Sequence, residues 1–413
     1  MLKTKDIIHP AAYGVILYML VGIARLPELY PFLKPLALGK IALIMAIIGL
    51  MKDKSGNSYK VSDEKLYKLV IFFAVLAVIS VAYSIWASYS LKFVTGRLFG
   101  IMLMFYIIIK TSHNEKAFKS YIITLIICAI ILSIETLKLK GLGRLSVGSS
   151  YDPNDLAQVM CTIIPIAIVY AFTSKTKIKY VYFGITILLL FTILLTGSRG
   201  GLLGLFIVLP FILKSLIRDT KSLMKIIAVT ILGVTIGVTV APDYTVERFN
   251  SMFNLEDDYN VTGEKGRLAI WGRGIDTMLS KPYGVGINAF SSAEGQAGGR
   301  HKAAHNVFIQ VGVELGFVGL IVFIMLLKRS FGILNILIKK FKESDGSDIS
   351  NTHATALALR ASMLGYLITG MFLSCGYTPL LFCLFGLIAA MSLNQNITII
   401  KNLHSTSFSK RSI

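Results

Sequence analysis

Apolar residues run along this chain in stretches about as long as a helix needs to cross a membrane. Crossing the hydrocarbon core takes roughly 20 helical residues, and such stretches recur from one end to the other, separated by short links that carry charge or Gly, Pro and Asn. The pattern predicts an all-α polytopic membrane protein that forms a single membrane domain over residues 1–413. About twelve transmembrane helices are predicted, near residues 11–24, 35–51, 66–86, 91–109, 118–137, 156–173, 180–196, 200–217, 224–240, 305–327, 354–375 and 380–400.

One segment, residues 241–304, is too long to be a simple connector between two spans. Apolar residues recur within it at helical spacing until Lys281-Pro282 ends the pattern; they are Leu268, Ile270, Trp271, Ile275, Met278 and Leu279. We expect a large outer loop whose amphipathic helix lies on the membrane face and roofs a cavity between the spans.

Composition supports a lipid environment, and the basic residues predict the orientation. The chain is 54% hydrophobic and 15% charged, against roughly 45–50% apolar and roughly 25% charged in soluble domains, which excludes a soluble protein. The net charge of +20 needs no nucleic-acid partner, because Lys and Arg lie in short links. The two ends and the links after even-numbered spans hold 25 of them, against 7 in the short odd-numbered links. Both termini are therefore expected in the cytoplasm, and the 241–304 loop outside.

His305, followed by Asn306, stands at the outer end of the tenth predicted span. A histidine can be neutral near pH 7 and can take the proton of an attacking hydroxyl; the alternative is a helix-start histidine that bonds water or headgroups. His301 lies four residues upstream, but no carboxylate completes a ligand set, so a metal is not expected. The four cysteines all lie in apolar stretches and are expected to be buried packing residues: Cys128, Cys161, Cys375 and Cys383.

Arg199 stands in the glycine-rich turn between the seventh and eighth spans, Thr196-Gly197-Ser198-Arg199-Gly200-Gly201. Glycines allow a close approach of backbone to a ligand, and the N-terminus of the next helix offers free N–H groups to an anion. An arginine is electrostatically misplaced at that end unless something negative binds there. The alternative is an arginine that reaches lipid phosphates at the interface.

Further candidates for a polar site lie in the outer loop and within the spans. Arg267 and Trp271 share one face of the predicted loop helix, which suits a phosphate or a sugar, while Arg273 and Arg300 are less defined; each could instead be a solvated charge. Arg97 and Lys40 lie inside spans, where a charge usually faces a cavity or reaches for the interface. Asp152 and Asp155 are expected to form a turn and an N-cap, and Asp257 and Asp258 a solvated run.

The order of these motifs resembles the bacterial O-antigen ligase and polymerase superfamily. Many spans are followed by the 196–201 turn, by Gly266-Arg267-Leu268-Ala269-Ile270-Trp271, by Lys281-Pro282-Tyr283-Gly284-Val285-Gly286, and by His305-Asn306 ahead of Glu314-Leu315-Gly316. The similarity is close in the second half of the chain. In the first half it lies in the layout and in Asp152-Pro153-Asn154-Asp155.

The resemblance implies a metal-independent, inverting glycosyltransferase of the C type in the bacterial inner membrane, with no cofactor and a periplasmic active site. It implies an undecaprenyl-diphosphate-linked glycan as donor, Arg199 and Arg267 as ligands of the diphosphate, and His305 as the residue that activates the acceptor. A further arginine common in ligases after the Pro-Gly turn is absent, and Arg300 or Arg273 would have to replace it.

Two reactions are open under this resemblance. In a ligase the acceptor is a lipid A core sugar, and in an O-antigen or exopolysaccharide polymerase it is another lipid-linked repeat unit. A lipid-linked glycan flippase or transporter is a third and more distant alternative. It would predict repeated halves with broken helices, which the sequence lacks.

Overall fold

The computed structural model describes residues 8–52, 60–139, 151–216, 224, 266–341 and 347–409. Within these ranges all regular structure is helical, which confirms the all-α prediction. The predicted span at 224–240 and residues 241–265 of the outer loop, with Asp257 and Asp258, lie outside the described ranges. The count of twelve spans therefore stays a prediction.

Seven helical segments in the described ranges are long and apolar enough to cross a membrane, which confirms a polytopic membrane protein. Each coincides with a predicted span to within a few residues at its start. They are α4 (Lys65–Ile79) with η4 (Ser80–Tyr83); α5 (Ala87–Phe93), η5 (Val94–Leu98) and α6 (Phe99–Thr111) as one segment; α7 (Glu115–Lys138); α8 (Pro153–Thr173); α9 (Ile178–Thr196); α10 (Arg199–Leu216); and α15 (Val307–Phe341).

The remaining helices are shorter, less apolar or peripheral. Two short apolar helices are α1 (Pro10–Gly22) and α3 (Leu38–Met51), and a third short apolar stretch begins α17 (Pro379–Ser409). Helix α16 (Ser347–Gly370) is long but more polar. The small elements are α2 (Leu26–Leu29), η2 (Pro31–Leu36), η3 (Val61–Asp63), α13 (Arg267–Ser280) and α14 (Phe290–Gln296).

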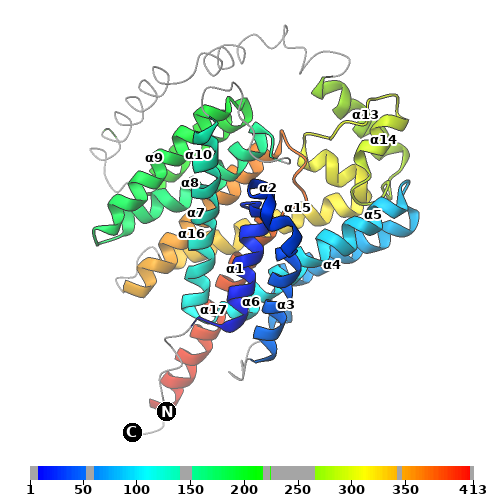
Figure 1. Cartoon of the computed structure of the whole chain (residues 1–413). Coiled ribbons are helices and arrows are strands. Elements are labelled where there is room, and N and C mark those ends of the chain that lie inside the picture. Colours follow the sequence, from blue (N-terminus) through cyan, green and yellow to red (C-terminus); the bar gives the residue numbers. More distant parts are fainter. Residues whose placement is uncertain are drawn as a thin grey trace.

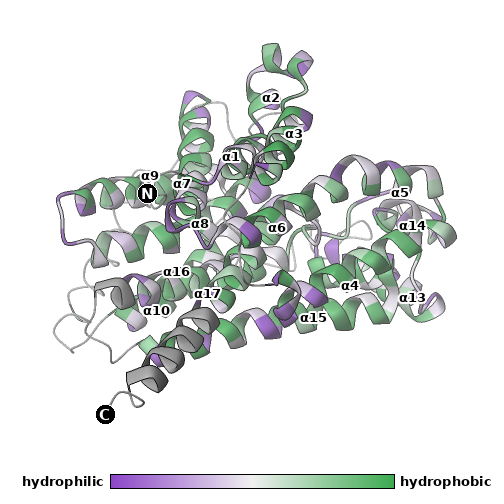
Figure 2. Cartoon of the chain, turned by 90° about the horizontal axis from the view of Figure 1, so that it is seen from below, coloured by the Kyte–Doolittle hydropathy of each residue, from purple (hydrophilic) through white to green (hydrophobic). Residues whose placement is uncertain are grey.

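Helix α8 forms the centre of the bundle, and α9, α10 and α16 pack around it. Most of its side chains are buried, whereas outer helices leave large apolar side chains exposed, as at Ile44 and Ile48 of α3. Figure 2 shows that hydrophobic residues dominate the helices and that hydrophilic ones gather mainly at ends and links. This inside-out distribution is expected when the solvent of the outer surface is lipid. The four cysteines are buried and unbridged, as predicted.

The helix ends fall into two groups at opposite ends of the bundle. At one end the rings of His9 and His113 lie 5.9 Å apart, and the Asn394 amide donates to the carbonyl of Ser112 at 2.8 Å. At the other end, which we call the site end, the Tyr151 hydroxyl just before α8 donates to the carbonyl of Ile23 after α1 at 2.8 Å, and both residues line a cavity with Gln310 of α15. Figure 1 shows α2, α13 and α14 near the site end and α17 running away from it.

Candidate active site at the site end of the bundle

Two turns that are far apart in the sequence are joined at the start of α8. Asp152 caps α8 by accepting hydrogen bonds from the N–H groups of Asn154 (2.6 Å) and Asp155 (3.0 Å), so the predicted N-cap is confirmed. The Ser198 hydroxyl donates to Oδ1 of Asn154 at 2.8 Å. A Cβ on Gly201 would lie 2.5 Å from the Ala157 side chain, so this glycine lets α10 approach α8 closely.

Arg199 and Arg267 begin two different helices that share one aromatic neighbour. Arg199 is the first residue of α10 and Arg267 the first of α13. The Arg267 guanidinium lies 5.8 Å from the centre of the Phe372 ring, and a Cβ on Gly200 would lie 3.2 Å from the same ring. Both arginines are half-buried. The fold therefore brings the starts of α10 and α13, each with an arginine, against Phe372.

His305 is held in place by its neighbours on both sides. Its backbone is left-handed, with φ of 46°, and its N–H donates to Oγ of Ser374 at 3.0 Å. The Trp271 indole N–H donates to the carbonyl of Ala304 at 2.9 Å. Asn306 caps α15 by accepting from the N–H groups of Phe308 and Ile309. Trp271 of α13 thus contacts the backbone next to His305. Within the His305-Asn306 pair, Asn306 serves as the helix cap, and the His305 ring is left available for chemistry.

Burial lowers the pKa of the His305 imidazole below its ordinary value. The positive charges of Arg267 and Lys302 act in the same direction, and the Asp152 carboxylate acts against them. These effects show that His305, Arg267 and Asp152 lie within electrostatic range of one another. The lowered pKa favours the neutral ring, which is the form that can accept a proton.

Arg273 and Arg300 differ sharply in their surroundings. Arg273 forms an ion pair with Oε1 of the buried Glu294 at 2.6 Å, and Oε2 of Glu294 accepts from the Lys302 N–H at 3.0 Å. Although burial alone would raise the pKa of Glu294, these hydrogen bonds and the charge of Arg273 lower it. Arg300 is exposed in the same loop. The ion pair of Arg273 with Glu294 therefore stabilises the fold of the loop. Arg300 is the more exposed of the two arginines.

The sequence analysis did not identify Glu294, although a signal was present. It is the only acidic residue between Asp276 and Glu314, in a stretch that holds Lys281 and, on either side of His301, Arg300 and Lys302. A lone carboxylate in a basic loop is a natural partner for one of its cations. Its partner Arg273 lies 21 residues away on a helix, so the pairing itself could not be predicted from sequence spacing.

The glycines at residues 284, 286 and 316 allow the backbone of the 281–286 segment to lie directly against the backbone of α15. Helix α15 is kinked at Gly316, where φ is 68°, and the N–H groups of Val285 and Gly286 donate to the carbonyls of Val313 and Glu314 at 2.9 and 3.0 Å. A Cβ on Gly284 would lie 2.5 Å from the Glu314 carbonyl oxygen. The 281–286 segment thus anchors the outer loop to the helix that begins next to His305.

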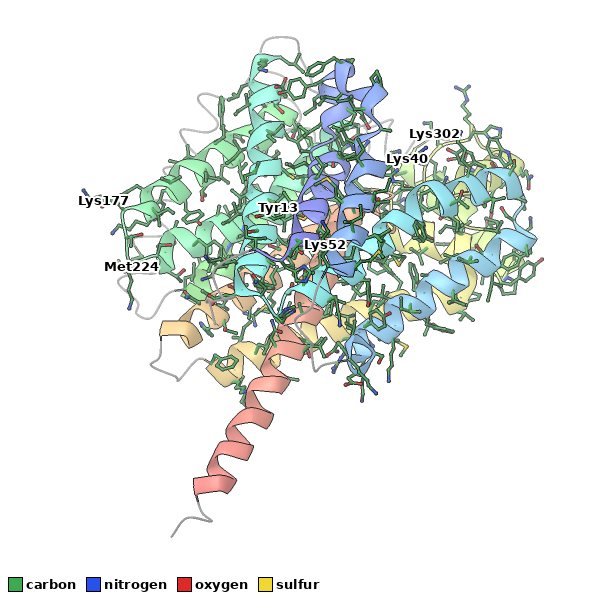
Figure 3. The ribbon with its side chains drawn as sticks, turned by 60° about the horizontal axis from the view of Figure 1, so that its bottom comes forward. Tyr13, Lys40, Lys52, Lys177, Met224 and Lys302 are labelled. Carbon is green, nitrogen blue, oxygen red and sulfur yellow. The ribbon has the colours of Figure 1, made fainter. Side chains whose placement is uncertain are left out.

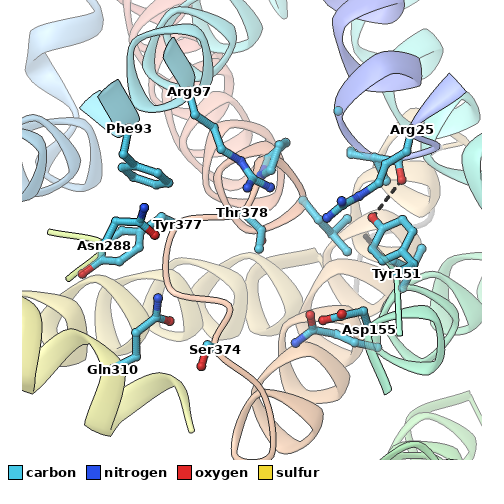
Figure 4. Close-up of a pocket in the computed structure, with 16 residues that line it drawn as sticks. Arg25, Phe93, Arg97, Tyr151, Asp155, Asn288, Gln310, Ser374, Tyr377 and Thr378 are labelled. Carbon is cyan, nitrogen blue, oxygen red and sulfur yellow. Dashed lines mark hydrogen bonds between the residues drawn. The ribbon is translucent and has the colours of Figure 1, made fainter. Parts of the chain in front are cut away.

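A polar cavity of about 200 Å³ opens beside His305. Figure 4 shows Arg97 and Asn288 on one side of it and Arg25, Tyr151 and Asp155 on the other. Ser374, which holds the His305 backbone, also lines the cavity. Of the two intramembrane cations singled out in the sequence, Arg97 lines this cavity, whereas Lys40 is exposed and does not (Figure 3).

Among the described residues no three His, Cys, Asp or Glu side chains gather as a metal ion would require. His301 is exposed, and its ring lies against Gly295.

Residues 184–324 match the family model described as O-Antigen ligase, and no curated protein matches the chain. The matched segment includes most of α9, all of α10, α13 and α14, and the first half of α15. It therefore contains Arg199, Arg267 and His305, and it confirms the resemblance to the O-antigen ligase superfamily. The match implies glycosyltransferase-type activity on lipid-linked glycans, in broad terms.

Proposed function

We propose that this chain, which carries the O-antigen ligase domain over residues 184–324, transfers a glycan from undecaprenyl diphosphate to a sugar hydroxyl at the outer face of the inner membrane. The observation that carries the proposal is the hydrogen bond from the Trp271 indole to the Ala304 carbonyl, which places α13, the helix that Arg267 begins, beside His305. A hydroxyl nucleophile needs a base, and a diphosphate leaving group needs cations.

The donor binds through its diphosphate. Arg199 and Arg267 begin the two helices that meet at Phe372, and each guanidinium presents a planar fork of donors that matches phosphate oxygens. Arg300, exposed in the outer loop, contributes a third contact to the donor. Trp271 lies beside this group and holds the backbone before His305 through Ala304.

In the reaction, the acceptor hydroxyl oxygen forms a new bond to the anomeric carbon of the donor sugar. The bond from that carbon to the diphosphate oxygen breaks, and its electron pair leaves with the diphosphate. His305 takes the hydroxyl proton, and Arg199 and Arg267 stabilise the charge that develops on the leaving group. Attack opposite the diphosphate inverts the anomeric carbon. No metal is required in this scheme, because arginines meet the diphosphate charge.

The acceptor we propose is a lipid A core sugar, as in a ligase; a polymerase would use a second lipid-linked repeat unit with the same donor chemistry. Deleting the gene separates the two. A ligase deletion leaves polymerised lipid-linked glycan to accumulate, and a polymerase deletion leaves single repeat units. The family match supports either transferase over a flippase or transporter.

The mechanism is tested by His305→Ala, with His301→Ala as the matched control in the same loop. We expect His305→Ala to lose about 100-fold or more of the transfer rate, the usual contribution of a general base, while the protein stays folded and binds donor. His301→Ala should keep most of the rate, since His301 is exposed.

Both variants are purified in nanodiscs and assayed with a lipid-linked donor, with and without EDTA. Wild-type transfer should survive EDTA. Full transfer by His305→Ala would remove His305 from the mechanism, and a rate that EDTA abolishes and a divalent ion restores would contradict metal independence.

A further inference from the structure

The cavity beside His305 has more positive than negative charge on its walls. Two arginines, Arg25 and Arg97, and one carboxylate, Asp155, line it. Arg25 is engaged by Glu28 at 3.3 Å and lies 4.1 Å from the centre of the Tyr151 ring. A charge at membrane depth is costly unless it is paired or serves a ligand. Arg25 therefore has an ionic partner in Glu28, whereas Asp155 is the one carboxylate on the walls that faces both arginines.

Arg97 is the cation of this cavity that no direct contact in the described part of the chain satisfies. It has no hydrogen bond or ion pair with any residue of the described ranges, and it is exposed even though it lies within a membrane-spanning segment. Figure 4 shows its guanidinium pointing into the cavity. Arg97 sits on η5, a π-helical turn between α5 and α6. Such turns are rare and occur frequently at functional sites, because they displace a side chain from its regular helical direction.

The other walls fit a sugar better than a simple anion. Asn288, Gln310 and Thr378 present amide and hydroxyl groups to the cavity. The Phe93 and Tyr377 rings, with centroids 5.9 Å apart, form an apolar wall beside them. A volume of about 200 Å³ is smaller than the roughly 300–1,000 Å³ of a pocket for a drug-sized ligand, so it suits a single ring and not an oligosaccharide.

We infer that this cavity binds one acidic sugar residue, a monosaccharide that carries a carboxylate or a phosphate, with Arg97 as the main ligand of its charge. Arg97 approaches from one side, while amide groups and the aromatic wall approach the ring. The position of the cavity also indicates which substrate this sugar belongs to. Ser374 both lines the cavity and accepts from the His305 N–H, so the cavity lies one residue away from the base, and a sugar held there can extend a hydroxyl toward it. The sugar is thus the acceptor, a step that rests on the proposed function.

The test is saturation-transfer difference NMR on the full-length protein in phosphatidylcholine nanodiscs, which supply no anionic lipid. The probes are glucuronate, glucose 6-phosphate and glucose. At least one acidic sugar should give a signal where glucose gives none, and which of the two it is distinguishes a carboxylate from a phosphate. This comparison uses the wild type alone, so it does not depend on how a variant folds.

The residue is tested by Arg97→Gln and Arg97→Lys, with Lys92→Gln as the matched control. Lys92 is an exposed cation on the same membrane-spanning segment that does not line the cavity. Arg97→Gln should weaken binding of the acidic sugar at least tenfold, Arg97→Lys should weaken it less, and Lys92→Gln should leave it unchanged. An equal signal from glucose, or binding by Arg97→Gln as in the wild type, would overturn the inference.

A further variant separates this inference from the proposed function. His305→Ala should abolish transfer and keep binding of the acidic sugar, because His305 does not line the cavity. If His305→Ala keeps both, the proposed function fails and the cavity assignment stands. If no acidic sugar binds while His305→Ala loses transfer, the cavity assignment fails alone.

Discussion

The guanidinium groups of Arg199 and Arg267 matter in this site for their shape as well as their charge. A lysine keeps the charge but offers one compact ammonium, whereas a guanidinium binds two phosphate oxygens at once. We therefore expect Arg199→Lys and Arg267→Lys each to lose about tenfold or more in kcat/KM, the loss of about one good charged hydrogen bond.

The control for these two variants is Lys177→Arg, on the exposed link between α8 and α9, far from His305 (Figure 3 labels Lys177 and, beside the site, Lys302). This change should leave the kinetics unaltered. If both lysine variants transfer the glycan at the normal rate and are present at the normal protein level, Arg199 and Arg267 contact lipid phosphates at the interface and do not bind the donor.

The charges around His305 predict how the pH profile responds to substitution. Since the pKa of His305 is lowered and the base must be neutral, kcat/KM should be full at neutral pH and fall only in acid, as pH drops through that lowered pKa. Arg267→Gln removes a charge that lowers the pKa, so the acid limb should move to higher pH. Asp152→Asn removes the charge that raises it, so the limb should move to lower pH.

Asparagine still caps a helix, so Asp152→Asn should keep α8 intact and isolate the electrostatic effect. Profiles of kcat/KM from pH 4.5 to 8 for the two variants and the wild type provide the measurement. Shifts in the same direction, or none, would mean that the acid limb does not report His305.

At the scale of elements, the helices that were predicted well are those whose start, end and spacing are set by residues close by in the sequence. The spacing from Leu268 to Leu279 and the Lys281-Pro282 stop predicted a helix, and α13 ends at Ser280. The start of α15 was predicted two residues early, since Asn306 is the cap. These features depend on neighbours within about one helical turn.

Features that depend on distant backbone were not predictable. The kink at Gly316 lies inside an apolar stretch and exists because residues 282–286 dock against it. Ser90 of α5 likewise donates to the carbonyl of Ile287 at 2.6 Å. The same limit applies to the candidate site. The motifs predicted His305, Arg199 and Arg267 as candidates, whereas Ser374, Asn288 and Tyr377, which hold His305 or line the cavity, come from segments without a local signal.

The docking of the outer loop on α15 can be tested with Gly284→Ala. Gly284 has φ of 94°, and a Cβ there would press on the Glu314 carbonyl oxygen and the Gly316 nitrogen, both of them backbone. Strain of this kind costs on the order of 1–3 kcal/mol, so the melting temperature should fall by several degrees, in the range of about 2–8 °C.

The matched control for the loop is Gly272→Ala on α13, where a Cβ would meet nothing within 4 Å. Alanine favours a helix over glycine by roughly 1 kcal/mol, so this variant should melt at the wild-type temperature or slightly above it. Melting of both proteins in nanodiscs is followed by intrinsic fluorescence. Equal melting temperatures for Gly284→Ala and the wild type would show that the close approach is not needed.

At the scale of the whole molecule, the distribution of charge and the gathering of helix ends lead to the same orientation. The links between α6 and α7 and between α8 and α9 are among those that hold the 25 basic residues. His305, Ser198 and Asp152 lie together at the site end. Because basic links tend to stay in the cytoplasm, we predict that the site end faces outward, where a lipid-linked donor would be presented.

The orientation predicts which of two engineered cysteines a membrane-impermeant maleimide reaches in right-side-out vesicles. Gln296→Cys, at the exposed C-terminal end of α14, should be labelled at once, and Lys177→Cys should be labelled only after the vesicles are opened. The four native cysteines are buried, so the wild type provides a low background. In inverted vesicles the two results should exchange. Labelling of Lys177→Cys but not Gln296→Cys in right-side-out vesicles would place His305 in the cytoplasm, where a base for transfer from an outward-facing lipid-linked donor has no use.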